Sequence, residues 1–206
     1  MTLAVMLVAG AAFAQGTAST ELTTANAQRT ETTFGDLAAD ALASAAGTPL
    51  ALVPAVSFKS GTIPAGAVTA ELVRELLTQP SETWAVVTLT GAELRETLER
   101  SVSRAPQPNG GFLQVSGLTL TYDPAQPRNA RITSLSIGGA TVQPDANYQV
   151  AMPLSLAKGG SGYFTIFGEA DIARNGSSEM ATVIVDYVAG QGSVSYTGRG
   201  RINVAG

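Results

Sequence analysis

Few side chains in this sequence could carry out catalysis. The 206 residues include no histidine and no cysteine. Histidine is the usual general base near neutral pH and the commonest transition-metal ligand, and a cysteine thiolate is a common nucleophile. A Ser-His-Asp triad, a His-containing two-metal centre and a cysteine-based zinc site are therefore excluded. A Mg²⁺ or Ca²⁺ site built only from carboxylates is chemically allowed, but the chain has no Asp-x-Asp-x-Asp run to supply one.

The carboxylates are better explained as structural groups than as an acid/base pair. Glu31, Asp36 and Asp40 fall at one end of a predicted helix, where they can cap it or pair with cations. Three more are expected on a solvated helix face: Glu93, Glu96 and Glu99. No two carboxylates are placed as a catalytic couple, so we expect no catalytic residue and no cofactor in this chain.

The overall charge and composition restrict the class of partner. The formal net charge is -4, and no window of the chain clusters lysine and arginine. A nucleic-acid groove needs a basic stripe to displace counterions, so we expect no nucleic-acid partner. With 45% hydrophobic residues the chain can bury one core, and we expect a single domain over residues 31–206.

The N-terminal residues have the pattern of a secretory leader. Residues 1–14 are apolar and end in Ala12-Phe13-Ala14, an A-x-A cleavage site. This run is shorter than the roughly 20 residues that span a bilayer. We therefore expect a signal peptide cleaved after Ala14, and export to the periplasm, cell envelope or medium. The alternative is a buried N-terminal helix, and the missing positive n-region leaves room for a start further upstream.

The rest of the chain alternates helical and strand patterns. Residues 15–30 lack apolar periodicity and predict a flexible lead-in. A helix is predicted over Phe34–Ala45 with Thr33 as its cap and Gly47 at its end. A second helix is expected to start at Thr69 and to be ended by Pro80. A third runs from the Thr90–Glu93 capping box to about Ser103. A fourth is expected over Ser178–Val188, where a strand is the competing interpretation.

The strand patterns complete an α+β fold. A hairpin turn is predicted at Gly138-Gly139, and Pro54–Gly66 is predicted to be a loop. The expected strands are Leu50–Val53, Trp84–Leu89, Leu118–Tyr122, Ile132–Ile137, Ala140–Val142, Tyr148–Met152 and Arg201–Val204. Helices and strands are interspersed but the second half is hairpin-like, so we expect mixed β-sheets flanked by helices.

A series of short motifs resembles the C-terminal domain of the 5'-nucleotidase family, in order and over residues 31 to about 204. The motifs are Glu31–Leu42, Ile63–Gly66, Leu89–Leu94, Gly110–Leu118, Lys158–Tyr163, Val185–Val188 and Gly200–Ile202. The resemblance implies layers in the order α/β/β/α. It also implies a division of labour, in which an N-terminal metallophosphoesterase domain holds two metals and the C-terminal domain grips the nucleoside between two aromatic rings.

Carried over residue by residue, the resemblance implies an eroded binding site. The family's Asn-Gly-Gly-x-x-Arg loop falls on Pro54–Lys59, where only Lys59 can replace the arginine. The first stacking ring is missing near Pro80, and the second corresponds to Tyr163 in the motif Gly159–Tyr163. The candidate nucleotide-binding residues are therefore Lys59, Gly160, Ser161 and Tyr163. The alternatives are a solvated loop charge for Lys59, a plain glycine turn, and a core aromatic for Tyr163.

These observations leave three functional hypotheses open. The first is an exported, stand-alone, non-catalytic module with weak nucleoside or nucleotide binding or an envelope interaction role. The second is the specificity subunit of a split nucleotide hydrolase whose metallophosphoesterase half is a separate chain. The third is a structural subunit of an envelope assembly.

Overall fold

The fold is built around a mixed five-stranded sheet with the strand order β12-β6-β11-β3-β7. The computed structural model describes residues 16–205, so the leader predicted for residues 1–14 lies outside the described residues. The five strands are β3 (Leu50–Pro54), β6 (Trp84–Thr90), β7 (Leu113–Ser116), β11 (Asn147–Pro153) and β12 (Ile172–Asn175). β3 and β11 run parallel and the remaining neighbours are antiparallel.

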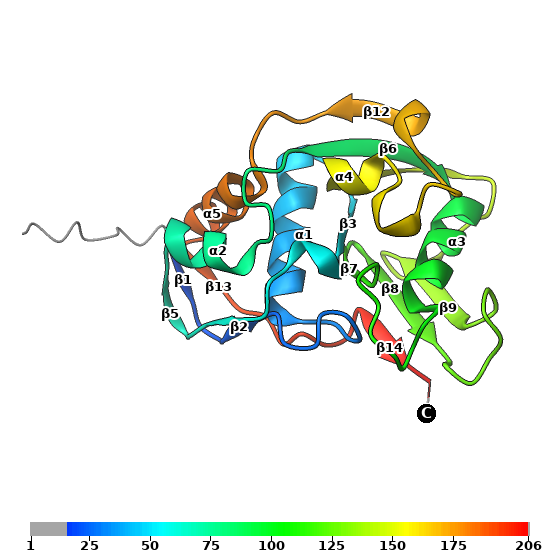
Figure 1. The fold of residues 1–206 in the computed structure, drawn as a ribbon, viewed down its shortest axis with the longest axis horizontal. Helices are drawn as coiled ribbons and strands as arrows, with labels where there is room; N and C mark the ends of the chain where they lie inside the picture. Colours follow the sequence, from blue (N-terminus) through cyan, green and yellow to red (C-terminus); the bar gives the residue numbers. More distant parts are fainter. Residues whose placement is uncertain (1–15, 206) are drawn as a thin grey trace, which may run out of the picture.

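A second, four-stranded sheet has the order β10-β9-β8-β14. Its strands are β8 (Leu118–Tyr122), β9 (Ile132–Ile137), β10 (Ala140–Thr141) and β14 (Ile202–Val204). β9 and β10 form the predicted hairpin, and Gly138 and Gly139 both have positive φ (56° and 82°), as a two-residue turn between antiparallel strands requires. β14 closes the sheet by pairing parallel to β8, so the end of the chain lies beside this sheet (Figure 1).

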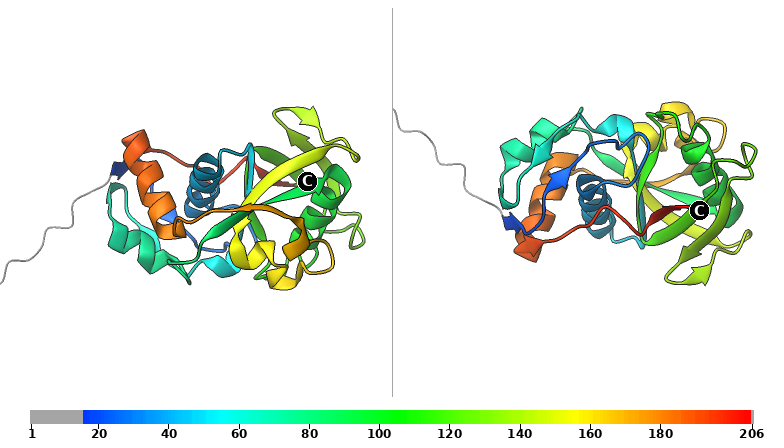
Figure 2. Two further views of the ribbon diagram at one scale, coloured as in Figure 1. Left: turned by 90° about the horizontal axis from the view of Figure 1, so that it is seen from above. Right: turned by 90° about the horizontal axis from the view of Figure 1, so that it is seen from below.

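Five helices pack around the sheets within the described residues. They are α1 (Thr33–Ala46), α2 (Ala70–Leu76), α3 (Gly91–Val102), α4 (Leu154–Ala157) and α5 (Met180–Gln191). α1 lies between the five-stranded sheet and α5, whereas α3 lies near the four-stranded sheet (Figures 1 and 2). Over residues 16–205, no helix is both long and apolar enough to cross a membrane.

The central strand β3 shows how one sheet separates two cores. Its side chains alternate, as in any strand. Ala51 and Val53 pack in the core formed with α1 and α5, whereas Leu50 and Leu52 pack in the core formed with α3, β8 and β9. All five residues of β3 are buried, so both faces of the sheet are covered. The predicted α+β class, with mixed sheets flanked by helices, is confirmed.

Residues 16–30 differ from the expected flexible lead-in. They include β1 (Gly16–Ala18) and β2 (Leu22–Thr23). β1 pairs with β5 (Gly66–Val68) and β13 (Ser193–Val194), and β2 pairs with β4 (Thr62–Ile63). Ala18 and Leu22 are buried in the α1–α5 core. The segment Pro54–Gly66, which was expected to be a loop, therefore contains β4 and the start of β5. Both strands form because they pair with β2 and β1, which are distant in sequence.

The predicted helix ends are largely confirmed. Gly47 ends α1 in the left-handed conformation, and Thr90 and Glu93 form the predicted capping box of α3. Residues 180–191 form a helix, as favoured over a strand. The cap of α1 is Thr32, one residue before the predicted one, and the Thr33 hydroxyl instead accepts a hydrogen bond from the Thr23 amide at 2.7 Å.

Glu99 is a correction to the predicted solvated face of α3. Its side chain is buried, with an exposed fraction of 4% for the residue. Its two carboxylate oxygens accept hydrogen bonds from the backbone amides of Arg131 (3.0 Å) and Ile132 (2.8 Å). Glu99 therefore fastens α3 to the start of β9, and it faces the core because of these two amides.

A cluster of two buried carboxyl groups, Glu31 and Asp36, and the half-buried Asp40 ties the C-terminal strand to α1. Glu31 accepts hydrogen bonds from the backbone amides of Arg201 and Ile202, both at 2.8 Å. The two terminal nitrogens of Arg201 donate to the two carboxylate oxygens of Asp40, at 2.7 and 2.8 Å. The Ser116 hydroxyl also donates to Asp40, at 2.6 Å. The predicted structural role of these carboxylates is confirmed, and we call Glu31, Asp36, Asp40 and Arg201 the C-terminal latch.

Asp36 is the unusual member of the C-terminal latch. The residue is 2% exposed, and one of its oxygens lies 3.6 Å from the Arg201 Nε. Burial raises the pKa of Asp36 from 3.8 to about 8; Arg201 acts in the opposite direction, and Glu31 and Asp40 add to the rise. Asp36 is therefore protonated at neutral pH. It can donate this proton to Glu31, whose Oε1 atom is otherwise buried without a hydrogen-bond partner.

This pKa gives the fold a defined dependence on pH. The folded domain keeps the Asp36 proton up to about pH 8, while the unfolded chain releases it near its ordinary pKa of 3.8. Between these values the folded state binds more protons, so the free energy of unfolding falls as pH rises. The contribution of Asp36 is thus complete below about pH 4 and lost above about pH 8.

We predict that Asp36→Asn removes this pH dependence, because the amide has no proton to lose. Urea unfolding at pH 5 and pH 9 measures it. The free energy of unfolding of the wild type, relative to Asp36→Asn, is expected to fall by on the order of a few kcal/mol over this range. The exposed Asp145→Asn serves as the control and should run parallel to the wild type. Parallel curves for Asp36→Asn as well would contradict the assignment.

Candidate functional site

The loop after β3 presents Lys59 at the surface. β3 ends at Pro54, and Ala55–Ser57 form one 3₁₀ turn. The amides at the start of the turn are held by carbonyls of the neighbouring loop: Ala55 by Phe112 O at 2.7 Å and Val56 by Gly110 O at 2.9 Å. The Lys59 amide donates to Leu76 O at 3.0 Å, and the Lys59 side chain is exposed. The backbone around Lys59 is therefore fixed on both sides.

Residues 24–30 face this loop and are held by one buried amide side chain. Gln114 is fully buried, and its side-chain nitrogen donates to the carbonyls of Ala27 (3.2 Å) and Thr30 (2.9 Å). Its side-chain oxygen accepts a hydrogen bond from the Thr32 amide at 2.9 Å. The Thr24 hydroxyl connects this segment to the loop that carries Lys59, since it donates a hydrogen bond to Lys59 O at 2.7 Å and accepts one from the Gly61 amide at 2.9 Å.

These two segments enclose a hollow of about 330 Å³, which we call the Lys59 hollow. Its volume is at the small end of the range for small-molecule sites. Lys59 and Arg29 supply positive charge, Asn26 supplies an amide and Phe58 supplies a ring, and none of the lining residues is acidic. The lining residues are Thr24, Asn26, Ala27, Gln28, Arg29, Ala55, Phe58, Lys59, Ser60 and Pro108.

The glycine motif Gly159–Tyr163 forms a tight turn after α4. Gly159 and Gly162 have φ of 83° and 85°, in the left-handed region that glycine adopts without strain. A Cβ on Gly159 would also lie 2.6 Å from the backbone of Phe164. Gly160–Gly162 form a single 3₁₀ turn, so Gly160 contributes backbone geometry. The alternative of a turn that requires glycine explains these positions without a ligand.

Tyr163 lies in the core, and no part of it is exposed. Its hydroxyl donates to Gly111 O at 2.6 Å, and its ring stacks on Phe167 with centroids 5.6 Å apart. The Arg100 guanidinium lies 5.4 Å from the ring centroid. Burial raises the pKa of the Tyr163 hydroxyl, which therefore stays protonated and acts as a donor. The ring has no face free for a base, in agreement with the alternative of a core aromatic.

Ser161 lines a different hollow, of about 420 Å³. Its lining residues are Arg100, Ser103, Arg104, Asn109, Gly111, Arg128 and Ser161. We call it the arginine hollow. The loop 108–111 separates it from the Lys59 hollow, because Pro108 lines one and Asn109 and Gly111 line the other. The candidate residues are thus not brought together: Lys59 lines one hollow, Ser161 the other, and Gly160 and Tyr163 line neither.

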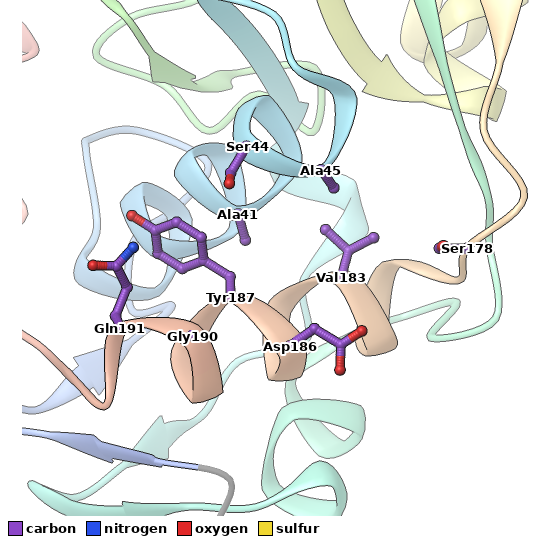
Figure 3. A pocket seen from close by; sticks show the side chains of 9 residues that line it. All are labelled: Ala41, Ser44, Ala45, Ser178, Val183, Asp186, Tyr187, Gly190 and Gln191. Atoms are coloured by element: carbon purple, nitrogen blue, oxygen red, sulfur yellow. The ribbon is translucent and has the colours of Figure 1, made fainter.

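A third hollow, of about 380 Å³, lies between α1 and α5. Figure 3 shows the ring of Tyr187 from α5 lying over Ala41 and Ser44 of α1. Asp186 is the single charged side chain among its lining residues, and the others are mostly small. None of the candidate residues lies here, although Ala41, Asp186 and Tyr187 belong to the motifs Glu31–Leu42 and Val185–Val188.

The comparisons with known proteins agree with this fold. The sequence matches the family described as "5'-nucleotidase, C-terminal domain" over residues 10–169. The chain belongs to this family. A 5'-nucleotidase precursor from Thermus thermophilus superposes with a TM-score of 0.84 and 29% identity, over 93% of this chain and 39% of that chain. The NAD nucleotidase of Haemophilus influenzae shares the fold at a TM-score of 0.77, with 14% identity over 95% of this chain and 39% of that chain.

The curated relatives are much longer proteins. Snake venom 5'-nucleotidase from Naja atra is 30% identical over 128 residues, which is 58% of this chain and 24% of that protein. Human 5'-nucleotidase is 29% identical over 115 residues, which is 52% of this chain and 20% of that protein. The matched part of this 5'-nucleotidase C-terminal domain therefore covers a quarter or less of the length of these relatives.

Some residues of the two hollows of this 5'-nucleotidase-type domain were not anticipated. Asn26 and Arg29 were missed because residues 15–30 lack periodicity, and their position depends on Gln114. Arg128 was missed because it is distant in sequence from Arg100 and Arg104, so no window shows a basic cluster. The spacing of four between Arg100 and Arg104, at the end of a predicted helix, is the one signal in the sequence.

We predict that Tyr163→Phe lowers the free energy of unfolding by about 1–3 kcal/mol, because Gly111 O is left buried without its donor. Thermal and urea unfolding measure the loss. Tyr148→Phe is the matched control: the Tyr148 hydroxyl accepts a hydrogen bond from the Gln143 amide at an exposed position, where water can replace it. Equal losses for the two variants would show that the Tyr163 hydroxyl bond is not a buried structural contact.

Proposed function

We propose that this domain recognises a nucleoside or nucleotide in the Lys59 hollow and does not catalyse hydrolysis by itself. The observation that carries the proposal is the lining of that hollow, which combines two cations, an amide and an aromatic ring with no acidic side chain. An anionic ligand with a flat aromatic part matches these groups. The family of this chain is described as the C-terminal domain of 5'-nucleotidase, which supports this class of ligand.

Each group in the Lys59 hollow has a defined role in the proposal. Arg29 can bind a phosphate through its planar guanidinium fork, and Lys59 supplies a point charge beside it. The Phe58 ring is held edge-on by Phe34, with centroids 5.8 Å apart and an interplanar angle of 85°. A single base–aromatic contact contributes roughly 1–3 kcal/mol, so we expect weak binding.

We predict that Lys59→Ala weakens AMP binding at least fivefold, because a cation next to the phosphate is lost. Isothermal calorimetry at constant ionic strength measures the affinity. Lys158→Ala is the matched control, since Lys158 is the second of the chain's two lysines and pairs with Glu169 at the surface, outside this hollow. Equal effects of the two substitutions, or no AMP binding by the wild type at millimolar concentration, would reject the proposed site.

A second candidate function is the specificity half of a nucleotide hydrolase. The length comparison favours it, because the chain corresponds to 39% of the Thermus thermophilus 5'-nucleotidase chain. In this proposal a metallophosphoesterase domain supplies the two metals, either on a separate chain or elsewhere on a longer one. The leader-like pattern of residues 1–14 supports an exported location for such an assembly.

We predict that this chain alone, with AMP and Mn²⁺, releases no phosphate above the rate without protein. A tagged form is expected to co-purify from its native cells with a metallophosphoesterase chain. That chain should then release phosphate from AMP faster when the domain is present than when it is absent. No increase on mixing would reject the split-hydrolase hypothesis, and phosphate release by the isolated domain would reject the non-catalytic one.

A further inference from the structure

Three arginines from two separate segments line the arginine hollow. Arg100 lies in the last turn of α3, Arg104 follows just beyond its end, and Arg128 comes from the loop between β8 and β9. All three residues are exposed. None of the residues that line this hollow is acidic. Positive charge is therefore concentrated there although the whole chain carries a formal net charge of -4.

These charges are not neutralised by the protein. Over residues 16–205, the side chains of Arg104 and Arg128 form no hydrogen bond or ion pair, and Arg100 forms only a 3.3 Å bond to Ser161 O. One carboxylate, Glu96, lines an adjoining hollow that Arg100 and Arg128 also line, and among the described residues it forms no ion pair with either. Five other arginines are committed to carboxylates or carbonyls: Arg74, Arg95, Arg131, Arg174 and Arg201.

The backbone around the arginine hollow is fixed by other side chains. Arg131 donates to Val102 O at 2.7 Å and to Ala105 O at 2.9 Å, so the loop with Arg128 is tied to the end of α3. Asn109 donates to Ser101 O at 2.7 Å and accepts a hydrogen bond from the Gly111 amide at 3.0 Å. The scaffold is thus preorganised, while the guanidinium groups of Arg104 and Arg128 keep all their donors available.

A structural role at the end of α3 does not account for these arginines. Cations near a helix C-terminus interact favourably with the helix dipole, by roughly 0.3–1 kcal/mol. Here the carbonyls at the end of α3 already have donors, since Arg131 binds Val102 O and Asn109 binds Ser101 O. Arg128 belongs to another segment and contributes nothing to the capping of α3. Helix capping therefore does not explain why the three arginines converge on one hollow.

We propose that the arginine hollow binds the phosphate group of a small molecule, as a second site separate from the Lys59 hollow. Guanidinium forks match the oxygens of a phosphate, and several forks favour a ligand with at least two negative charges. Ser161 lines the same hollow and its hydroxyl can donate to a further oxygen, whereas the Ser103 hydroxyl already donates to Arg100 O at 2.7 Å. The lining has no aromatic side chain, so it selects the phosphate rather than a base.

Calorimetric titration of the whole protein with inorganic pyrophosphate tests this site. The double substitution Arg104→Ala/Arg128→Ala is expected to weaken binding at least tenfold. Arg199→Ala, which removes one positive charge from an exposed position outside the hollow against the two removed by the double substitution, should leave the affinity within twofold of the wild type. Thermal unfolding of each variant checks that these exposed substitutions leave the fold intact.

Further titrations distinguish binding in the arginine hollow from the proposed binding in the Lys59 hollow. Lys59→Ala should keep its pyrophosphate affinity, so failure of the Lys59 site and failure of the arginine site give different results. Titration with orthophosphate and with AMP shows whether free phosphate or a nucleotide phosphate is preferred. Absence of pyrophosphate binding by the wild type at millimolar concentration overturns the proposal. So does an equal loss in the Arg199→Ala control, because it would indicate a general effect of charge.

Discussion

The interaction on which the rest of the fold depends is the bidentate pair between Arg201 and Asp40, together with the two amides that Glu31 accepts. It joins the two ends of the domain across 170 positions of sequence. Asp36 and Asp40 share the one guanidinium and Glu31 binds only backbone amides, so ionisation of all three carboxyl groups would leave uncompensated negative charge beside buried Asp36 and Glu31. Protonation of Asp36 removes part of that charge, and Ser116 and backbone amides satisfy the rest.

Strand β7 connects the C-terminal latch to the Lys59 hollow. Within three consecutive residues, Gln114 holds the wall of the Lys59 hollow, Val115 O accepts a hydrogen bond from Arg201, and Ser116 donates to Asp40. The hollow and the C-terminal latch are therefore supported by one strand at the edge of the five-stranded sheet. Gln114 is fully buried and its side-chain amide bonds to Ala27, Thr30 and Thr32, so residues 24–30 are anchored directly to the core.

Local signals predicted the elements whose ends are determined locally. The Thr90–Glu93 capping box and the Gly138-Gly139 turn need only neighbouring residues, and both were found in the sequence. The sequence does not predict strands β1 and β2, because they pair with segments distant in the chain and carry no apolar alternation. Lys59 and Ser161 were located from motifs. That they line different hollows depends on the inward position of Tyr163, which only the packed structure defines.

The distribution of charge restricts the ligand more than the net charge does. Five cations lie next to loop 108–111, with Arg29 and Lys59 on one side and Arg100, Arg104 and Arg128 on the other. Asn109 pins this loop to both sides, since its amide donates to Gln28 O at 2.9 Å and its side chain to Ser101 O at 2.7 Å. A polymer such as nucleic acid needs a continuous basic stripe, which the fixed loop interrupts. Two separate cationic hollows instead suit the small anions proposed above, despite the overall negative charge of the chain.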